Sequence, residues 1–593
     1  MDHGAVTPRF AGFGRRMRLF CLLARDFFRT PFYDALLLAG LLGLGLFLPD
    51  ALPAATRTAG GYSTGEDAIN LIAAFYGRAV FLGVAVFLLL GFSLPGRCKR
   101  FSLSEAVSPC GGLRKTLRTQ RFLLFCLSLL WQFFTVILAL WLAFTCGAAH
   151  PLFLKNVLLA SILYGLLPSL TGALLGAAWQ SLGNKTGFFL FFLWTVFFSS
   201  RLSTDVWLLA GTLLEKAATL QAGAAVQRVL GLWYRLPPLY NSVVDASVGI
   251  PIEPLRWVLY LTWAALAIGA LLLRSRRWIS AAICLCLCLL SGFCFLRGGS
   301  MQTEALLPTA ELAARSDLSY YTENPDRQTR PSTDFTITDY DMTLRFGTAL
   351  SAEVSMSVSG GSDPAYAFTL SHHYRVSGIW DASGSALPFT QEGDTVTVQA
   401  ENADVIRMVY RGAADCFLSN AQAIWLPGYF CWYPVEGKYP VWSGCGYAIN
   451  ADQPTRRFSV RVYTACPCFS NLPESEDEIF SGSAATLSLV GGLYEQSEAN
   501  GVRQIYPWCA APTDVADRLA EAVERENRTS ETTLPVPAIK TVIYVPTFDL
   551  PVPFGGQSAV FLGDTLLLGG YQYGLNIPTI LDCYRKEAAS CWN

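Results

Sequence analysis

The chain has 593 residues, of which 52% are hydrophobic and only 15% are charged, so it is too apolar for a purely soluble protein of this length. Its formal net charge of -1 gives no basic excess, which speaks against a nucleic-acid partner. Composition therefore favours an integral membrane protein with more than one domain.

The first stretch of the chain is basic and partly apolar. Arg15 to Thr30 reads RRMRLFCLLARDFFRT and sets leucines and phenylalanines among arginines at roughly helical spacing, which is typical of a helix lying in the membrane interface. Pro31 would separate this helix from the first span, although the same residues would also fit the flank of that span. Because no small-residue cleavage site follows an apolar core, we expect 1–31 to remain as a cytoplasmic or interfacial N-terminal segment.

Long apolar runs follow, joined by short loops. A bilayer core about 30 Å thick needs about 20 apolar residues as helix, and the runs of that kind predict about seven spans. They are Tyr33 to Leu48, Leu71 to Leu94, Phe122 to Cys146, Val157 to Trp179, Phe188 to about Leu209, Trp257 to Leu273 and Trp278 to Leu296. The fifth is the weakest, because its apolar run is interrupted from Ser200. After it, Val206 to Tyr240 is broken by charges and prolines, and we expect short helices there that dip into the outer leaflet.

Lysine and arginine set the orientation. They gather at the N-terminus, in the loop Arg97 to Arg121 and in the hairpin Arg274 to Arg277, which share one side if the spans alternate. By the positive-inside rule that side is the cytoplasm, so an odd number of spans places the chain after Arg297 outside. We expect a multi-pass protein of the plasma membrane, with residues 32–297 as its membrane domain.

Beyond a linker at 298–333, the pattern has period two. Apolar residues alternate with mostly polar ones from Phe335 to Phe346 and again around Val354 to Val358, as in half-buried strands. Further strands are predicted at Tyr374 to Trp380, Thr395 to Val398, Val405 to Tyr410, Phe458 to Tyr463 and Thr486 to Val490. We expect an antiparallel β-rich ectodomain, a sandwich or saddle, over 334–512. Residues 513–593 would add a helix near Asp514 to Glu526 and a strand at Thr541 to Val545.

The membrane half resembles the permease subunit of type-two ABC exporters. The resemblance covers about Arg15 to Leu273 and rests on the in-plane helix, the spans, the basic loop after the second span and the short helices before the last. It implies that Arg15 to Thr30 and Arg97 to Arg121 face a separate ATPase subunit, and that the membrane domain dimerises. No GxxxxGK[ST] loop occurs in this chain, so the ATPase would be another polypeptide. Positive-inside topology alone would also explain the basic loop.

The ectodomain resembles the N-terminal part of aminopeptidase N family (gluzincin) proteins, and its strands would then form their saddle domain. The residues that carry this resemblance are Tyr340 to Leu344, Met408 to Gly412, Trp432 to Pro434 and Pro553 to Gly556. Each motif is short, and their order along the chain makes the case. A permease followed by such a domain is a pairing that bacterial fusion proteins also show.

The chemistry of a zinc peptidase is missing from the sequence. Such an enzyme needs HExxH on a helix, and the four histidines, His3, His150, His372 and His373, do not provide it. His372 and His373 are adjacent in an apparent strand, so we expect them to point to opposite faces. The resemblance also implies an amine-binding Glu after Gly555-Gly556, where Gln557 stands instead. We therefore predict no enzyme activity, no catalytic, cofactor-binding or metal-binding residues, and no cofactor; the chain ends at Asn593 about where the zinc helix would begin.

Other candidate sites are weaker. Ser371 beside His372 suggests a nucleophile, but no third group is identifiable, and we expect an ordinary surface serine in a strand. Asp415, Glu436 and the run Glu474 to Glu478 lack Ca²⁺-binding spacing, so we expect a solvated acidic loop. The ectodomain cysteines, richest from Cys416 to Cys445, favour disulfides of unknown connectivity in an oxidising compartment. Cys466-Pro467-Cys468 is expected to be structural rather than redox-active.

Three functions remain open from the sequence. The first is the permease of an ABC-type exporter with a non-catalytic, aminopeptidase-like ectodomain that binds peptide or another surface ligand. The second is a membrane-anchored binding or sensor protein without transport. The third is a truncated membrane peptidase whose zinc domain is encoded separately. The cargo is not readable from the residues.

Overall fold

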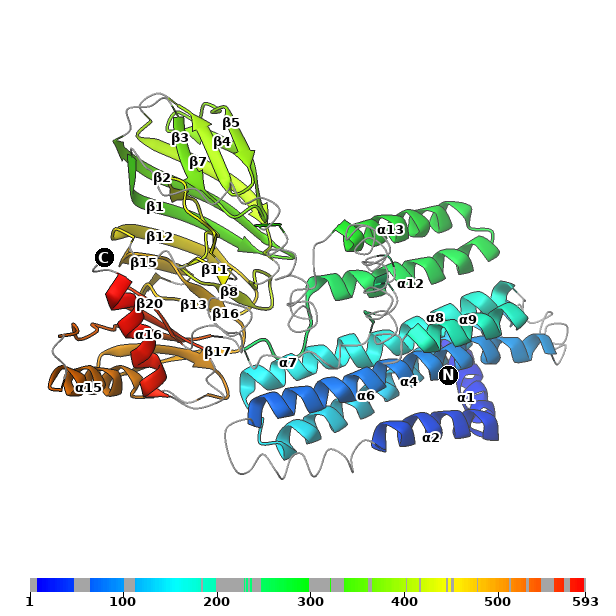
Figure 1. Cartoon of the computed structure of the whole chain (residues 1–593). Coiled ribbons are helices and arrows are strands. Elements are labelled where there is room, and N and C mark those ends of the chain that lie inside the picture. Colours follow the sequence, from blue (N-terminus) through cyan, green and yellow to red (C-terminus); the bar gives the residue numbers. More distant parts are fainter. Residues whose placement is uncertain are drawn as a thin grey trace, which may run out of the picture. The chain divides into compact units, whose positions relative to one another are not determined.

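The computed structural model describes residues 8–46, 64–100, 112–182, 185–198, 229, 231–232, 235–236, 247–297, 320–321, 335–360, 365–400, 403–414, 417–443, 446–448, 453–476, 478–510, 513–529, 533–545, 559–569 and 576–590. Most of Val206 to Tyr240, most of the linker 298–333 and the motif Pro553 to Gly556 lie outside them. The chain divides into a helical unit and a β-rich unit (Figure 1). Residues 241–254, which precede the last two apolar helices, belong to the β-rich unit.

The helical unit confirms a helical N-terminal half. Its elements are α1 (Pro8–Phe28), α2 (Pro31–Gly45), α4 (Thr64–Arg100), α6 (Gly112–Thr145), α7 (Pro151–Ser161), the π-helical turn η3 (Ile162–Leu166), α8 (Leu167–Leu182), α9 (Lys185–Phe198), α12 (Pro254–Arg274) and α13 (Trp278–Arg297). Within the described residues, five helices are long and apolar enough to cross a membrane: Ala68–Pro95, Thr116–Thr145, Pro151–Leu182, Pro254–Arg274 and Trp278–Leu296. The predicted seven spans are therefore not confirmed.

The start of the helical unit is sharply bent. Met17–Phe28 and Pro31–Gly45 meet at 75° and together qualify as a sixth, broken span. Thr30 has extended backbone, φ -101° and ψ 105°, as the residue before a proline prefers. Phe27 stacks on Tyr33 across the bend at 4.9 Å between ring centroids. The predicted break at Pro31 is thus present.

The fifth predicted span is shorter than expected. Helix α9 has 14 residues, about 21 Å at 1.5 Å per residue, which is less than a bilayer core of about 30 Å. The remaining residues predicted for this span, after Phe198, lie outside the described residues.

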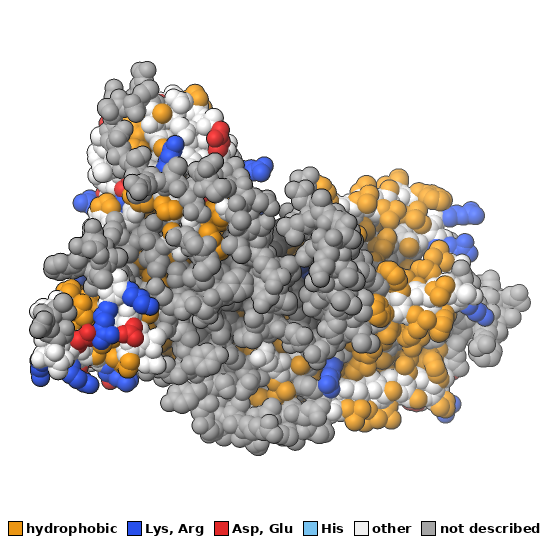
Figure 2. All heavy atoms as spheres, in the orientation of Figure 1, with side chains coloured by type: hydrophobic (Ala, Val, Ile, Leu, Met, Phe, Trp, Pro, Cys, Tyr) orange, Lys and Arg blue, Asp and Glu red, His pale blue; other side chains and the backbone are white. Residues whose placement is uncertain are grey.

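Glycines let α4 and α8 approach each other closely. A Cβ on Gly172 would lie 2.7 Å from the Val84 carbonyl oxygen, and one on Gly176 would lie 2.2 Å from that of Leu88. Two glycines four residues apart on one face are a common contact surface between membrane helices. Figure 2 shows hydrophobic side chains gathered over the visible face of the helices, which suits a lipid environment.

The β-rich unit is built around two sheets. The larger sheet has the order β14-β15-β12-β1-β2-β7-β4, and the smaller one β5-β6-β3-β9. The strands of the larger sheet are β1 (Phe335–Phe346), β2 (Leu350–Gly360), β4 (Tyr374–Asp381), β7 (Val405–Gly412), β12 (Arg456–Tyr463), β14 (Glu474–Glu476) and β15 (Ile479–Ala484). Those of the smaller sheet are β3 (Ala365–Thr369), β5 (Phe389–Glu392), β6 (Thr395–Gln399) and β9 (Val435–Glu436). The predicted β-rich domain is confirmed and is mostly antiparallel, but β1 and β12 pair in parallel, and the five-stranded sheet described below also contains parallel pairs.

Alternation in β1 separates two faces of the seven-stranded sheet. Tyr340, Met342 and Leu344 are buried in the main core, whereas Asp339 and Asp341 project to the other side. Three aromatic side chains that are at most 2% exposed, Trp425, Trp432 and Trp442, belong to the same core.

Three further sheets belong to the described part of the unit. A three-stranded sheet contains β13 (Cys468–Ser470), β16 (Leu489–Gly491) and β8 (Ile424–Leu426), and β10 (Trp442–Ser443) pairs with β11 (Gly446–Tyr447). A five-stranded sheet has the order β17-β18-β19-β21-β20, with bounds Tyr494–Ala499, Val502–Pro507, Thr541–Tyr544, Thr565–Leu568 and Ala559–Leu562. Helices α15 (Val515–Asn527) and α16 (Ile577–Ser590) share a core with it. This last layer begins at Tyr494, ahead of the boundary predicted at 513.

Candidate functional site

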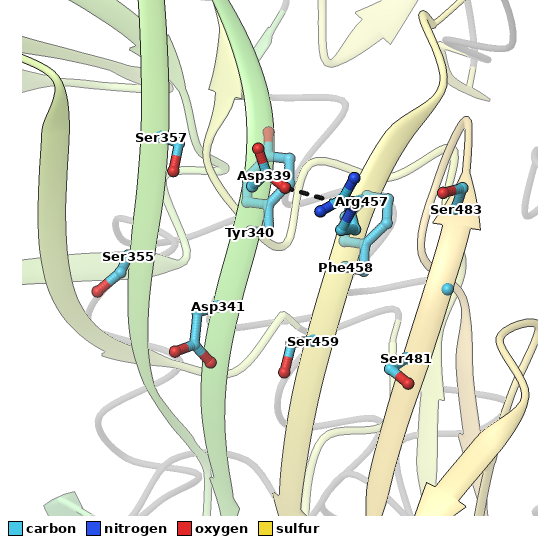
Figure 3. Close-up of a pocket in the computed structure, with 11 residues that line it drawn as sticks. Asp339, Tyr340, Asp341, Ser355, Ser357, Arg457, Phe458, Ser459, Ser481 and Ser483 are labelled. Atoms are coloured by element: carbon cyan, nitrogen blue, oxygen red, sulfur yellow. Dashed lines mark ion pairs between the residues drawn. The ribbon is translucent and has the colours of Figure 1, made fainter.

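A polar hollow of about 490 Å³ lies on the outer face of the seven-stranded sheet. Side chains from four adjacent strands line it, as Figure 3 shows. This outer hollow comprises Asp339, Asp341, Ser355, Ser357, Arg457, Ser459, Ser481, Gly482 and Ser483, with Tyr340 and Phe458 below them.

Strand register explains why these residues meet. Ser355 is paired with Asp341, Asp341 with Ser459, and Ser459 with Ser481. Directly paired residues project from the same face of a sheet, so they form one continuous row. The neighbouring row contains Ser357, Asp339, Arg457 and Ser483. Serine side chains are short, which leaves the space open between the longer charged ones.

The charges in the outer hollow are accessible to solvent. Asp339 and Arg457 form an ion pair of 3.6 Å, with side chains 43% and 78% exposed. Exposed ion pairs of this kind contribute about 1 kcal/mol or less to stability. Either side chain can therefore leave its partner and bind a ligand instead at low energetic cost. Asp341 is also exposed and lies opposite serines on both sides.

An aromatic side chain extends the same row. Arg407 of β7 is paired with Ser355 and with Trp380 of β4. Its guanidinium lies 5.7 Å from the centre of the Trp380 ring and 2.6 Å from Glu353. A Cβ on Gly378 would lie 2.4 Å from the indole, so only glycine leaves room for the ring there.

The histidine pair is placed differently from the prediction. His372 and His373 lie in the turn between β3 and β4, not in a strand, and their ring centroids are 4.1 Å apart. The expectation of opposite faces is wrong, because strand alternation begins only at Tyr374. Asp394, which the sequence analysis missed, lies 3.0 Å from Nδ1 of His372.

The Ser371 pairing also differs from the prediction. The Oγ of Ser371 shares a hydrogen bond of 3.0 Å with Nδ1 of His373. The carboxylate of Asp394 contacts the other imidazole, that of His372. Ser371 is 0% exposed, so a substrate cannot reach its hydroxyl. A serine, histidine and carboxylate are close here but do not form a catalytic relay.

The acidic candidates separate into different environments. Glu436 is buried in β9 and paired with Arg456, which corrects the expected solvated loop, and Glu474 to Glu476 form strand β14. Among the described residues, no group of three or more His, Cys, Asp or Glu could hold a metal ion. Asp415, Cys416 and Cys445 lie outside this part of the chain.

Cys466 and Cys468 have the properties of structural thiols. Both are free in the structure. Burial raises the pKa of Cys466 to about 11 and that of Cys468 well above its usual value. The thiolate is the reactive form, so neither thiol is activated for exchange.

We expect Cys466 to be alkylated slowly at neutral pH. With a pKa of about 11, its thiolate fraction at pH 8 is about 10⁻³, and the rate should rise about tenfold per pH unit until pH approaches 11. Iodoacetamide labelling followed by peptide mass spectrometry measures this rate, with the urea-unfolded chain as control. Native labelling as fast as in urea would show that the thiol is activated.

A strap, residues 247–253, is built into the β-rich unit directly before α12. The Ile252 amide donates to Oε1 of Gln422 at 2.6 Å. Nε2 of Gln422 donates to the carbonyl oxygens of Val248 at 3.1 Å and Ile250 at 2.7 Å. The sequence analysis missed this site, since these partners are separated by 170 residues or more and Gln422 lies between two alanines.

Strand β16 leads into the second attachment of the strap. The Leu493 amide donates to the Ser247 carbonyl at 2.7 Å. Gly492 has φ +131°, and a Cβ there would lie 2.5 Å from that carbonyl oxygen, so glycine is required. Val248 and Ile250 are at most 1% exposed. The strap is therefore a packed part of the β-rich unit.

Comparison with known proteins gives distant matches. No family model and no curated protein matches the chain. Among solved structures it is similar to the M1 zinc metallopeptidase from Deinococcus radiodurans, at 14% identity and a TM-score of 0.31 over 43% of this chain and 64% of that one. A mutant of that organism's M1 zinc metallopeptidase gives 15% identity and a TM-score of 0.30 over the same shares.

A third solved structure is a two-domain M1 zinc metallopeptidase mutant bound to L-arginine. It has 14% identity and a TM-score of 0.31, covering 44% of this chain and 66% of that one. This chain thus spans less than two thirds of the length of the first two structures. None of the three is a permease.

Proposed function

We propose that this protein is the permease subunit of an ABC-type exporter in a bacterial cell membrane. Its aminopeptidase-like ectodomain is non-catalytic and binds peptide or another surface ligand outside the cell. A separate ATPase subunit docks on the cytoplasmic face, at Arg15 to Thr30 and Arg97 to Arg121, and two membrane domains pair.

The strap is the observation that carries this proposal. Its residues belong to the ectodomain fold, and Pro254, the next residue, begins the membrane helix α12. A change of the ectodomain on ligand binding would therefore reach a membrane helix through folded chain rather than through a loose linker. A mere anchor needs no such connection.

The helical unit supports the membrane part of the proposal. The 75° bend between Met17–Phe28 and Pro31–Gly45 suits an in-plane helix leading into a span. The close glycine contacts between α4 and α8 suit packing within a bilayer.

The hairpin of α12 and α13 supports an ectodomain outside the cell. The two helices are antiparallel neighbours, since Thr262 Oγ1 donates to Ser291 Oγ at 2.9 Å and Gly269 lies beside Leu285. Both outer ends connect to the β-rich unit, and the turn between them is the basic hairpin Arg274 to Arg277. Positive charge favours the cytoplasm for that turn. A cytoplasmic N-terminus then requires an odd total of crossings, so the proposal needs one crossing in addition to the five long helices and the bent pair, and it assigns that crossing to the segment that contains α9.

The non-catalytic assignment rests on the sequence. The four histidines do not form HExxH, and Gln557 follows Gly555-Gly556 where the family has its amine-binding segment. We expect the purified chain to hydrolyse no aminoacyl-p-nitroanilide when zinc is added.

Co-purification tests the exporter function. The full chain, extracted in mild detergent from its host, should bring down an ATPase. Arg118→Glu with Arg121→Glu, two arginines near the start of α6, should reduce the recovered ATPase about tenfold or more, since charge pairs across an interface commonly contribute at least about 1.4 kcal/mol.

A matched control reverses the same charge elsewhere. Arg274→Glu with Arg277→Glu changes the other basic turn, which the proposal does not place against the ATPase. Protease protection of the ectodomain in sealed vesicles verifies that orientation is kept in both. If the unmodified chain recovers no ATPase, or if both double variants lose it equally, the exporter proposal fails.

A further inference from the structure

We propose that the outer hollow binds a carbohydrate chain. The proposal takes the extracytoplasmic position of the site from the proposed function, and it names the ligand class that the ectodomain recognises.

The shape of the outer hollow fits a small organic ligand. Its volume of about 490 Å³ lies within the range of about 300–1,000 Å³ that is usual for ligand sites. It occupies the middle of the sheet, over β2, β1, β12 and β15, and stays open to solvent. A long polymer can therefore lie across it without threading.

The lining matches a ligand with many hydroxyl groups. Serine hydroxyls both donate and accept hydrogen bonds, the carboxylates of Asp339 and Asp341 accept them, and the guanidinium of Arg457 donates them. A sugar ring presents neighbouring hydroxyls that can donate to a carboxylate or accept from a guanidinium. Because the hydroxyls of a sugar are uncharged, their binding does not change the net charge of the Asp339–Arg457 ion pair.

Other ligand classes fit the lining less well. A peptide that adds a strand needs a free sheet edge, whereas β1 and β12 are paired on both sides. The side chains facing the hollow are almost all polar, so pockets for apolar peptide side chains are lacking among its lining residues. A phosphate group would meet Asp339 and Asp341, whose charges repel it.

Trp380 provides the apolar surface that a sugar ring also needs. It lies in the same row as Asp341, through Arg407 and Ser355. Three strand spacings of about 4.8 Å separate β4 from β1, or about 14 Å, and β15 lies about 10 Å further. The row is therefore long enough for several linked sugar rings, one of them over the indole.

Titration of the full chain in nanodiscs with chitohexaose, cellohexaose and maltohexaose tests the proposal. At least one hexasaccharide should bind with a saturable isotherm. Asp341→Asn keeps the size of the side chain but removes its charge, and it should weaken binding about tenfold, as expected for a hydrogen bond to a charged group. Trp380→Ala should weaken it by a similar factor.

The matched control is Asp404→Asn, which removes an exposed carboxylate directly before β7, outside the residues that line the hollow. It should bind like the unmodified chain. Absence of binding by all three hexasaccharides overturns the proposal, as does binding that Asp341→Asn and Trp380→Ala leave unchanged. Sugar binding is measured without ATP, so its failure is distinct from failure to recover an ATPase.

Discussion

Replacing Arg456 by Met is expected to destabilise the β-rich unit by about 3–5 kcal/mol, because it leaves the carboxylate of Glu436 buried without its cation. The two side chains are 1% and 3% exposed, and Nη2 of Arg456 donates to Oε1 of Glu436. Arg456 begins β12 of the larger sheet, whereas Glu436 ends β9 of the smaller one. The ion pair thus joins the two sheets.

Further hydrogen bonds are formed around this ion pair. Nη2 of Arg456 donates to Gln453 Oε1 at 2.9 Å, and the Tyr340 hydroxyl donates to the Pro434 carbonyl at 2.9 Å. Burial raises the pKa of Tyr340 well above its usual value, so its hydroxyl stays protonated and cannot supply a charge. Removing Arg456 would therefore leave a carboxylate that is 3% exposed without its ion-pair partner.

Thermal unfolding followed by tryptophan fluorescence measures the effect, since Trp425, Trp432 and Trp442 lie in the same core. The double variant Arg456→Met with Glu436→Gln should recover most of the loss, because no buried charge remains. Lys540→Met breaks the exposed pair of Lys540 with Asp564, at 3.1 Å, and should cost about 1 kcal/mol or less. Equal losses from Lys540→Met and Arg456→Met would refute the role of burial.

Local patterns account for much of the fold. Alternation from Phe335 to Phe346 predicts β1, and the apolar face of Asp514 to Glu526 predicts α15, because each depends on neighbours within one element. Hydropathy likewise finds α4, α6, α12 and α13. Asp339 and Asp341 flank the buried Tyr340 in β1, and serines stand at positions 355, 357 and 359 of β2, so the sequence also contains a signal for the polar face of the outer hollow.

Contacts between residues that are distant in the sequence could not be predicted from local patterns. The parallel pairing of β1 with β12 joins Asp341 to Ser459 across more than a hundred residues, and nothing local specifies that register. The same holds for Asp394 beside His372 and for Gln422 beside the strap. Each is a polar contact between residues that are distant in the sequence. Secondary-structure propensity and hydrophobic periodicity do not predict such contacts.

Replacing Gln422 by Ala is expected to release the strap from the rest of the β-rich unit. The side chain makes three hydrogen bonds to the backbone of Val248, Ile250 and Ile252. At about 1 kcal/mol net for each, the loss is about 3 kcal/mol, which raises the population of the released strap about a hundredfold. The Ile252 amide should then exchange its hydrogen faster by about that factor, as hydrogen exchange with mass spectrometry would detect.

Gln391→Ala is the matched control for this release. Gln391 also bridges backbone groups, since its Oε1 accepts from the Val376 amide at 3.0 Å and its Nε2 donates to the Tyr374 carbonyl at 2.7 Å, but it does not contact the strap. It should lower the stability of the ectodomain without a selective change at Ile252. If both variants speed exchange at Ile252 equally, the strap is not held by Gln422.

Strap release should also uncouple the two halves of the protein. In the proposed exporter, Gln422→Ala keeps the basal ATP hydrolysis of the recovered complex, because the cytoplasmic face is unchanged. The ectodomain ligand should no longer alter that rate, since α12 now begins after a loose segment rather than after folded chain. Ligand binding itself should persist, because Gln422 precedes β8 of the three-stranded sheet and does not line the outer hollow. An unchanged response of ATP hydrolysis to ligand in Gln422→Ala would mean that the strap does not transmit the signal.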